Sequence, residues 1–320
     1  MSTPRSGLRP ARPPRGSRKL GAARRFLEKK LPRGFTLVEL VIVIMIVGVI
    51  AATLTVFLRP AVENYLASRA RADLTDQAET ALRRIVRDVR VAVPNSIRTP
   101  GAQCVEMLPT SSGGRYRAGP DTVNDAVSCT ASTCAASLDT TQATTSFDVL
   151  TPLAATPAVG DWVVVGNQNP TDVYAGVNRA AITSFAASSP VAAFGRHRII
   201  VASTQFPLGY DGGRFSIVPN SQRAVFYVCS GADGTLDAGG NGKGTLYRLM
   251  NYGFNAAYPA ACPATTGGDV LATRLRSCSF VYDPNQGATQ QNGFVWMQLE
   301  VARNTEAAHL AIGAHVSNAP

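Results

Sequence analysis

An apolar run of 24 residues, 35–58, constrains this 320-residue chain more than any other feature. Its one charged residue is Glu39, near its start. A helix of this length would be about 36 Å long at about 1.5 Å per residue, and the hydrocarbon core of a bilayer is about 30 Å thick. We therefore expect residues 35–58 to form a helix that crosses a membrane or packs among other apolar helices.

The residues before the run have the wrong order for an ordinary secretory signal. Such a signal has basic residues, then an apolar run, then a small-residue cleavage site. Here the basic residues end at Arg33, and the small residue Gly34 directly precedes the run. Cleavage after Gly34 would leave the apolar segment at the N-terminus of the mature protein. Two alternatives stay open, an uncleaved single-pass anchor and a signal peptidase site at Ala51-Ala52, but neither gives a reason for Glu39.

The junction between the basic residues and the apolar run, residues 33–40, reads Arg-Gly-Phe-Thr-Leu-Val-Glu-Leu. It resembles the leader motif of the type IV pilin and type II secretion pseudopilin superfamily. The resemblance implies that a prepilin peptidase cleaves between Gly34 and Phe35 and methylates the new amine of Phe35. It also implies partners, namely other major and minor pilins that pack against the N-terminal helix.

Glu39 is the candidate residue for subunit assembly. An ionised carboxylate inside an apolar helix is costly and usually has a partner or a function. After cleavage the amine of Phe35 would lie four residues away, so the amine of one subunit could pair with Glu39 of a neighbour and neutralise both charges. The resemblance implies the same role, which sets the register of the assembly. The alternative is a carboxylate that is tolerated at the bilayer edge.

The net charge of +10 comes from the segment that would be removed. Eleven of the 31 basic residues and one of the 21 acidic residues lie in residues 1–34, so residues 35–320 carry twenty of each. The mature chain is formally neutral, and we expect no nucleic-acid partner. We predict a disordered cytoplasmic leader, a single pass through the inner membrane, and a periplasmic domain that later joins a pilus or pseudopilus.

Apolar residues recur at helical spacing beyond the run, which predicts an amphipathic helix over residues 59–93. Pro60 predicts a kink in this helix, and Pro94 predicts its end because proline disfavours helix in the preceding residue. Charged residues occupy the opposite face. The apolar positions are Val62, Tyr65, Leu66, Ala70, Leu74, Ala78, Ala81, Leu82, Ile85, Val86 and Val89.

Residues 94–320 are predicted to form a β-rich globular domain, which makes the fold class α+β: a long N-terminal helix packed on an antiparallel sheet. Residues 95–160 are rich in Gly, Ser, Thr, Ala and Pro and are expected to be mostly loops. Runs of β-branched and aromatic residues then predict strands. They are 161–165, 179–185, 198–202, 214–218, 224–229, 245–250, 278–282, 293–301 and 308–316. The last alternates most clearly, with Leu310, Ile312, Ala314 and Val316 on one face.

Six cysteines follow the apolar run, and an even number in an oxidising compartment favours disulfides. Fifteen pairings are possible. Three cysteines lie in each half of the domain, so full pairing needs at least one bridge between the halves, and two of them, five residues apart, are candidates for a small closed loop. We expect no metal site because no Cys-x-x-Cys occurs. The cysteines are Cys104, Cys129, Cys134, Cys229, Cys262 and Cys278.

The sequence offers no catalytic cluster and no cofactor motif. The three histidines are His197, His309 and His315, and the last two would share a strand face about 20 Å apart. No nucleophile elbow, metalloprotease motif or phosphate loop occurs. Residues 233–242 combine acidic residues, asparagine and glycine without the spacing of an EF-hand, so a turn is favoured there over a calcium loop.

Later segments are similar to the MshO family of minor pilins, which belongs to the mannose-sensitive haemagglutinin (MSHA) pilus system. They include residues 57–61, 72–76, 81–90, 113–117, 225–229 and 315–320. The large β domain also resembles J-type pseudopilins of type II secretion. We expect a low-copy subunit for pilus initiation or the tip complex, with no enzymatic activity. A tip adhesin and a membrane-anchored periplasmic enzyme are the alternatives from other classes.

Overall fold

The computed structural model describes residues 34–130, 133–187, 195–208, 212–286, 292–304 and 306–318. Of the predicted leader, residues 1–33 lie outside the described residues. The chain divides into two compact units, Met1–Pro60 and Ala61–Pro320. The apolar run lies in the first unit, and the amphipathic segment and the β-rich domain lie in the second.

Helix α1 (Leu37–Arg90) contains both predicted helical segments in 54 residues. The helix continues without a break through Pro60. The kink at Pro60 stays a prediction. In the apolar part, the hydroxyls of Thr53 and Thr55 donate to carbonyls one turn earlier in the helix, at 2.9 and 2.7 Å. These bonds satisfy the polar side chains without any outside partner, which suits an apolar environment.

In the second unit, α1 buries the predicted apolar stripe from Leu74 onward. The start of the stripe differs from the prediction, because Val62, Tyr65 and Leu66 are more than half exposed. The helix ends at Arg90 because the next residues pair with residues 108–110 in extended form. The buried stripe residues are Leu74, Ala78, Ala81, Leu82, Ile85, Val86 and Val89.

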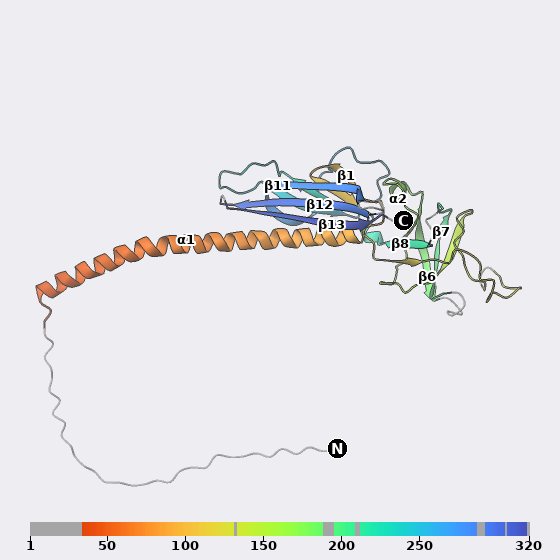
Figure 1. The fold of residues 1–320 in the computed structure, drawn as a ribbon, viewed down its shortest axis with the longest axis horizontal. Coiled ribbons are helices and arrows are strands. Elements are labelled where there is room, and N and C mark those ends of the chain that lie inside the picture. Colours follow the sequence, from red (N-terminus) through yellow and green to blue (C-terminus); the bar gives the residue numbers. More distant parts are fainter. Residues whose placement is uncertain are drawn as a thin grey trace, which may run out of the picture. The chain divides into compact units, whose positions relative to one another are not determined.

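The stripe packs on a seven-stranded antiparallel sheet with the order β1-β2-β9-β10-β11-β12-β13. Figure 1 shows its long strands beside the C-terminal part of α1. The predicted alternation of the last strand is confirmed, because Ala314 and Val316 are buried and Leu310 and Ile312 pack against the same core. The strands are β1 (Arg98–Gly101), β2 (Cys104–Met107), β9 (Val225–Ser230), β10 (Gly244–Met250), β11 (Asp269–Gln286), β12 (Asn292–Arg303) and β13 (Glu306–Ser317).

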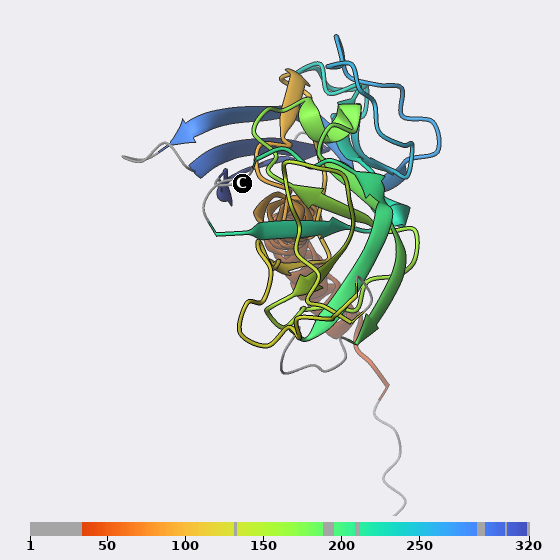
Figure 2. The ribbon, with the colours of Figure 1, turned by 90° about the vertical axis from the view of Figure 1, so that its right-hand side faces the viewer.

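A second antiparallel sheet has six strands in the order β3-β8-β5-β6-β7-β4 and its own apolar core. Its strands curve strongly in Figure 2. Its two edges meet at a bridge between Tyr116 and Val149, flanked by backbone hydrogen bonds, so the sheet closes into a small barrel. The strands are β3 (Ser112–Arg115), β4 (Thr144–Val149), β5 (Trp162–Val165), β6 (Arg179–Ala187), β7 (His197–Thr204) and β8 (Arg214–Val218); the short helices are α2 (Asp172–Ala175) and the 3₁₀ turn Asn220–Gln222.

Residues 95–160 lie mostly outside strands, as predicted, and they also contribute four short strands, β1 to β4. The structure corrects one expectation. The domain has two antiparallel sheets where one was expected. All nine predicted strands are present, and the strand predicted at 278–282 is the centre of the much longer β11. The residues of β11 before Leu275 pair with β10, and those from Leu275 onward pair with β12.

A buried polar clamp, formed by Asp88, Tyr227 and Arg248, fastens α1 to the large sheet. The Tyr227 hydroxyl donates to Asp88 Oδ2 at 2.6 Å, and Arg248 Nη2 donates to the same oxygen at 2.9 Å. Arg248 Nη2 also donates to Gln222 Oε1 at 2.8 Å. Burial, reinforced by the Asp88 charge, raises the pKa of Tyr227, so its hydroxyl remains a donor. The one sign of this clamp in the sequence is Asp88, an acidic residue inside the apolar stripe.

A second buried polar cluster contains Arg98 and Glu106, which are both fully buried. Arg98 Nε lies 3.1 Å from Glu106 Oε2. The Arg98 guanidinium lies over the Tyr174 ring at 3.2 Å and donates to the carbonyls of Asn255 and Ala257. Burial raises the pKa of Glu106, against the lowering effects of a hydrogen bond and of the Arg98 charge. This group attaches the loop before β11 and the helix α2 to the edge of the large sheet.

All six cysteines are paired. Cys129 and Cys134 close the small loop that their spacing suggested. Cys104 pairs with Cys262 across the two halves of the domain, which is the required bridge between halves. Cys229 and Cys278 form the third disulfide. The Cys104 bridge holds the same loop as Arg98, so that loop has a covalent and a polar attachment.

The clamp predicts a large difference between two acidic residues of α1. The substitution Asp88→Ala leaves Arg248 and the Tyr227 hydroxyl buried without their partner, and we expect it to lower the free energy of unfolding by about 3–5 kcal/mol. The control Glu79→Ala removes an exposed pair with Arg83 and should cost about 0.3–0.5 kcal/mol. Urea unfolding of the full chain in detergent micelles measures both, and equal losses would contradict the clamp.

Candidate functional site

The candidate site is the amino end of α1, where Thr36 caps the helix. The backbone N–H of Glu39 donates to Thr36 Oγ1 at 3.3 Å, and the Leu40 N–H donates to the Thr36 carbonyl at 3.2 Å. A threonine followed three residues later by glutamate is the capping-box spacing. Thr36 is therefore the N-cap of α1, and the spacing that indicates this role can be read in the sequence. The cap begins the helix two residues after Phe35.

Gly34 and Phe35 precede the helix in non-helical conformation, and both are exposed. Phe35 is 73% exposed, and nothing lies within 4 Å of the position that a Cβ on Gly34 would occupy. The predicted scissile bond is therefore accessible in the described part of the chain. The carboxylate of Glu39 is also exposed and, among the described residues, has no ion-pair partner. It lies in the first turn, where the helix dipole favours a negative charge.

The apolar part of α1 is exposed all round. Its most apolar 18-residue window has a mean hydropathy of 3.0 and is 0% buried, which makes α1 long and apolar enough to cross a membrane. Sixteen large apolar side chains between Leu37 and Leu58 are exposed. At about 1.5–3 kcal/mol for each such side chain, leaving this surface in water would cost tens of kcal/mol. The segment therefore needs lipid or other apolar helices around it, as membrane anchoring would provide.

The family model of the prokaryotic N-terminal methylation motif matches residues 29–55. The described part of this match contains Gly34, Phe35, the Thr36 cap and Glu39. This is a type IV pilin-like prepilin leader. The match supports a type IV pilin or pseudopilin-like protein, and it covers the helix start and most of the apolar run. No curated protein and no solved structure is significantly similar to the chain.

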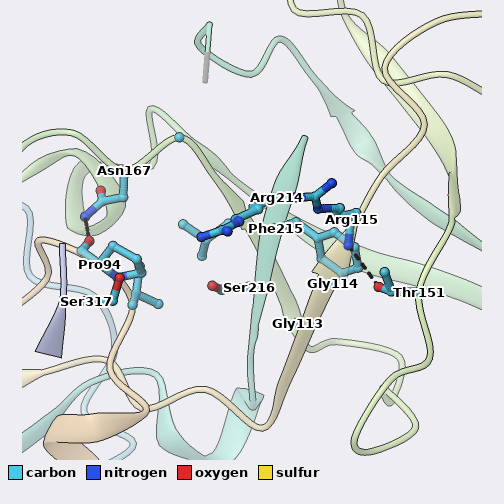
Figure 3. A pocket seen from close by; sticks show the side chains of 13 residues that line it. Pro94, Gly113, Gly114, Arg115, Thr151, Asn167, Arg214, Phe215, Ser216 and Ser317 are labelled. Carbon is cyan, nitrogen blue, oxygen red and sulfur yellow. Dashed lines mark hydrogen bonds between the residues drawn. The ribbon is translucent and has the colours of Figure 1, made fainter. Parts of the chain in front are cut away.

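A pocket of about 340 Å³ is lined by the paired strands β3 and β8, by the end of β13 and by the segment after α1. In Figure 3 the Asn167 amide donates to the Pro94 carbonyl at one side, and the Arg115 N–H donates to Thr151 at the other. Its ionisable lining residues are Arg115 and Arg214, which face each other across paired strands. Arginine remains protonated at neutral pH, so these two side chains can attract an anion but cannot exchange protons.

The histidines lie apart, as their spacing predicted. His309 and His315 share one face of β13, opposite Glu300 and Phe294 of β12. His309 Nε2 lies 3.4 Å from Glu300 Oε1, and the His315 ring packs against Phe294. His197 packs against Phe185 in the barrel. Each histidine therefore has a local contact of its own.

The loop at residues 233–242 uses its acidic side chains as turn acceptors. Asp237 Oδ1 accepts from the N–H groups of Gly239 and Asn241, both at 2.8 Å, and Asp233 Oδ1 accepts from Thr235. These hydrogen bonds lower the pKa of both carboxyl groups. The contacts support the turn. The ligand atoms of Asp125, Cys129 and Cys134 also lie close enough together to hold a metal ion. The two cysteine sulfurs, however, are joined in a disulfide.

The outer face of the large sheet carries an aromatic patch, formed by Phe294, Trp296 and His315. The rings of Phe294 and Trp296 are stacked with centroids 6.4 Å apart, and His315 lies 4.8 Å from Phe294. Gly313 lies beneath Phe294, where a Cβ would clash with the ring. Trp296 is 38% exposed, and its cross-strand neighbour Val281 is 54% exposed. The patch is a partly exposed apolar surface of the kind that contacts partners.

Proposed function

We propose that this chain is a minor, low-copy type IV pilin-like subunit that takes part in pilus initiation or in the tip complex. The observation that carries the proposal is the junction at residues 34–39, where the methylation motif coincides with a capped and fully exposed apolar helix. A prepilin peptidase would cleave between Gly34 and Phe35 and methylate the Phe35 amine. No reaction is assigned to the chain itself, which acts as a peptidase substrate and a structural subunit.

The pairing of Glu39 with a neighbour's Phe35 amine follows from the cost of burying either charge alone. Both groups lie at the exposed tip of α1, and the Glu39 carboxylate has no partner in the described part of the chain. Once the tip is surrounded by apolar helices or lipid, an unpaired charge would cost several kcal/mol. A neighbouring amine removes that cost and fixes the axial register between subunits.

The minor-pilin assignment rests on size and on sequence similarity. A mature chain from Phe35 to Pro320 carries two sheets and three disulfides on one α1 helix. Such a large head fits a subunit present in few copies, at the tip or in the complex that starts assembly. The similarity to the MshO family favours an MSHA-type pilus, and a J-type pseudopilin of type II secretion is the alternative. In either system the mature chain would pass from the inner membrane into the fibre.

The Glu39 proposal predicts a specific assembly defect. The substitution Glu39→Gln keeps the side-chain shape and removes the charge, so we expect membrane insertion to persist and incorporation into sheared fibres to fall at least about ten-fold. The control Thr55→Val changes a polar side chain that bonds within its own helix and should leave incorporation unchanged. Quantitative immunoblotting of membranes and fibres measures both. Normal incorporation of Glu39→Gln would contradict the register role.

A tip adhesin is the second candidate function, and the aromatic patch favours it. Stacked rings on a rigid sheet are suited to contact with an apolar or sugar-like surface. In that case Trp296→Ala should reduce attachment to host or particle surfaces while fibre incorporation stays normal, and Val270→Ala, another exposed apolar residue of the same sheet, should change neither. An attachment assay with fibre-normalised cells decides this. Unchanged attachment by Trp296→Ala would exclude the patch as an adhesive surface.

A further inference from the structure

The long strand β13 has a free edge, unlike the other strand edges that the structure describes. The edges of the six-stranded sheet close on each other at Tyr116 and Val149. The opposite edge of the large sheet, β1, has four residues and contains Pro100, which cannot donate to a partner strand. β13 has twelve residues, no proline and no lysine, and β12 is its one neighbour among the described strands. Such an edge is a template for another strand.

β13 and α1 run side by side and are tied together at both ends. Arg71 of α1 forms an ion pair with Glu306 at the start of β13. At the other end, the backbone N–H of Asn95 donates to Asn318 Oδ1 at 3.2 Å. Figure 1 shows β13 beside the C-terminal part of α1. The ties fix the distance between helix and strand, so the space between them has a defined width.

A groove with a volume of about 760 Å³ lies between these two ties. It is lined by α1 residues between Glu79 and Arg90, by Val91 after the helix, and by residues 309–312 of β13. Its floor is apolar and includes Leu82, Val86, Leu310 and Ile312. Leu310 and Ile312 are only partly buried, whereas Ala314, further along the same face of β13, is buried. The core is therefore open along the edge of the sheet at the groove. This volume lies in the range of ligand sites, about 300–1,000 Å³.

The helical wall of the groove carries three arginines and one glutamate. Arg83, Arg87 and Arg90 follow one another at helical spacing of four and three residues. Arg83 is paired with Glu79. Arg87 and Arg90 are exposed and have no carboxylate partner among the described residues. Two free guanidinium groups thus lie beside a free strand edge and an open apolar floor.

We propose that this groove receives an extended acidic segment of another subunit, which adds to β13 as an eighth strand of the large sheet. Its backbone would pair with the outward N–H and C=O groups of β13, as in other cases of strand addition. On the inner face of the added strand, apolar side chains would cover Leu310 and Ile312, and carboxylates further along the same face would meet Arg87 and Arg90. The inference rests on the proposed function for the identity of the partner as a fellow subunit, and on the groove alone for its chemistry.

The test measures peptide binding to the purified full chain in detergent micelles. The probe is a fluorescent ten-residue peptide in which threonine alternates first with valine and then with glutamate, so that the valines and glutamates share one face of the strand. Binding is followed by fluorescence anisotropy. Two control peptides separate the contributions: one has lysine in place of glutamate, and one has alternate backbone nitrogens methylated, which keeps the charge but removes the donors of one edge. We expect only the first peptide to bind and to slow amide hydrogen exchange of residues 309–312.

Charge variants then locate the site. The double variant Arg87→Gln, Arg90→Gln should weaken binding at least about ten-fold, as expected for two partly exposed ion pairs. The matched control Arg69→Gln changes an exposed arginine of the same helix outside the groove and should bind like the unchanged chain. Both substitutions are at exposed positions, so circular dichroism should show the same fold. Equal binding by the double variant would overturn the proposal.

Other occupants give distinct results. Equal binding of the methylated peptide would show charge attraction without strand pairing and would overturn the proposal. A dimer of the full chain that disappears in the double variant would make a second copy the occupant, which also overturns it. Peptide binding requires neither cleavage nor assembly, so a failure here with normal fibre incorporation refutes the groove alone. Peptide binding together with a chain that never enters fibres refutes the proposed function alone.

Discussion

The apolar surface of α1 between Leu37 and Leu58 is the constraint on which the rest of the molecule depends. Within the described residues this surface is uncovered, and its hydrocarbon area would cost tens of kcal/mol in water. Thr36 caps the segment, and the hydroxyls of Thr53 and Thr55 form hydrogen bonds within the helix. Glu39 is therefore the one charged side chain of the segment that needs a partner. A helix with these properties is suited first to a bilayer and then to a bundle of equivalent helices. The methylation motif at its start is consistent with both stages.

The head domain is built so that the second half of the same helix is a fixed part of its core. The stripe from Leu74 to Val89 forms the apolar contact with the sheet. The clamp of Asp88 with Tyr227 and Arg248 sets the orientation of the helix on the sheet. Apolar packing alone tolerates rotation and sliding of a helix, whereas a buried carboxylate with two donors defines one rotation and one height. The clamp therefore fixes the rotation and height of residues 74–90 of α1 on the large sheet.

Local patterns in the sequence predicted most of the helices and strands. The contacts between these elements depend on residues that lie far apart in the sequence. The apolar run of residues 35–58, the stripe of α1 from Leu74 onward and the alternation of β13 are local patterns, and the structure shows each of them. The clamp was not predicted because Tyr227 and Arg248 lie 139 and 160 residues from Asp88. The closure of the barrel at Tyr116 and Val149 is likewise non-local. The strands β1 and β3 were missed because they contain glycine or proline and no large apolar residue, a composition that indicates loops.

The central claim is that the chain is processed between Gly34 and Phe35, and mass spectrometry of the N-terminus tests it most directly. The protein would be purified from its native membrane and digested, and its first peptide would be sequenced. The account predicts a mature chain that begins with N-methyl-Phe35. A chain that keeps residues of the leader, or that begins within the apolar run after Ala52, would contradict it, because the apolar helix would then not carry an amine at its tip to pair with Glu39.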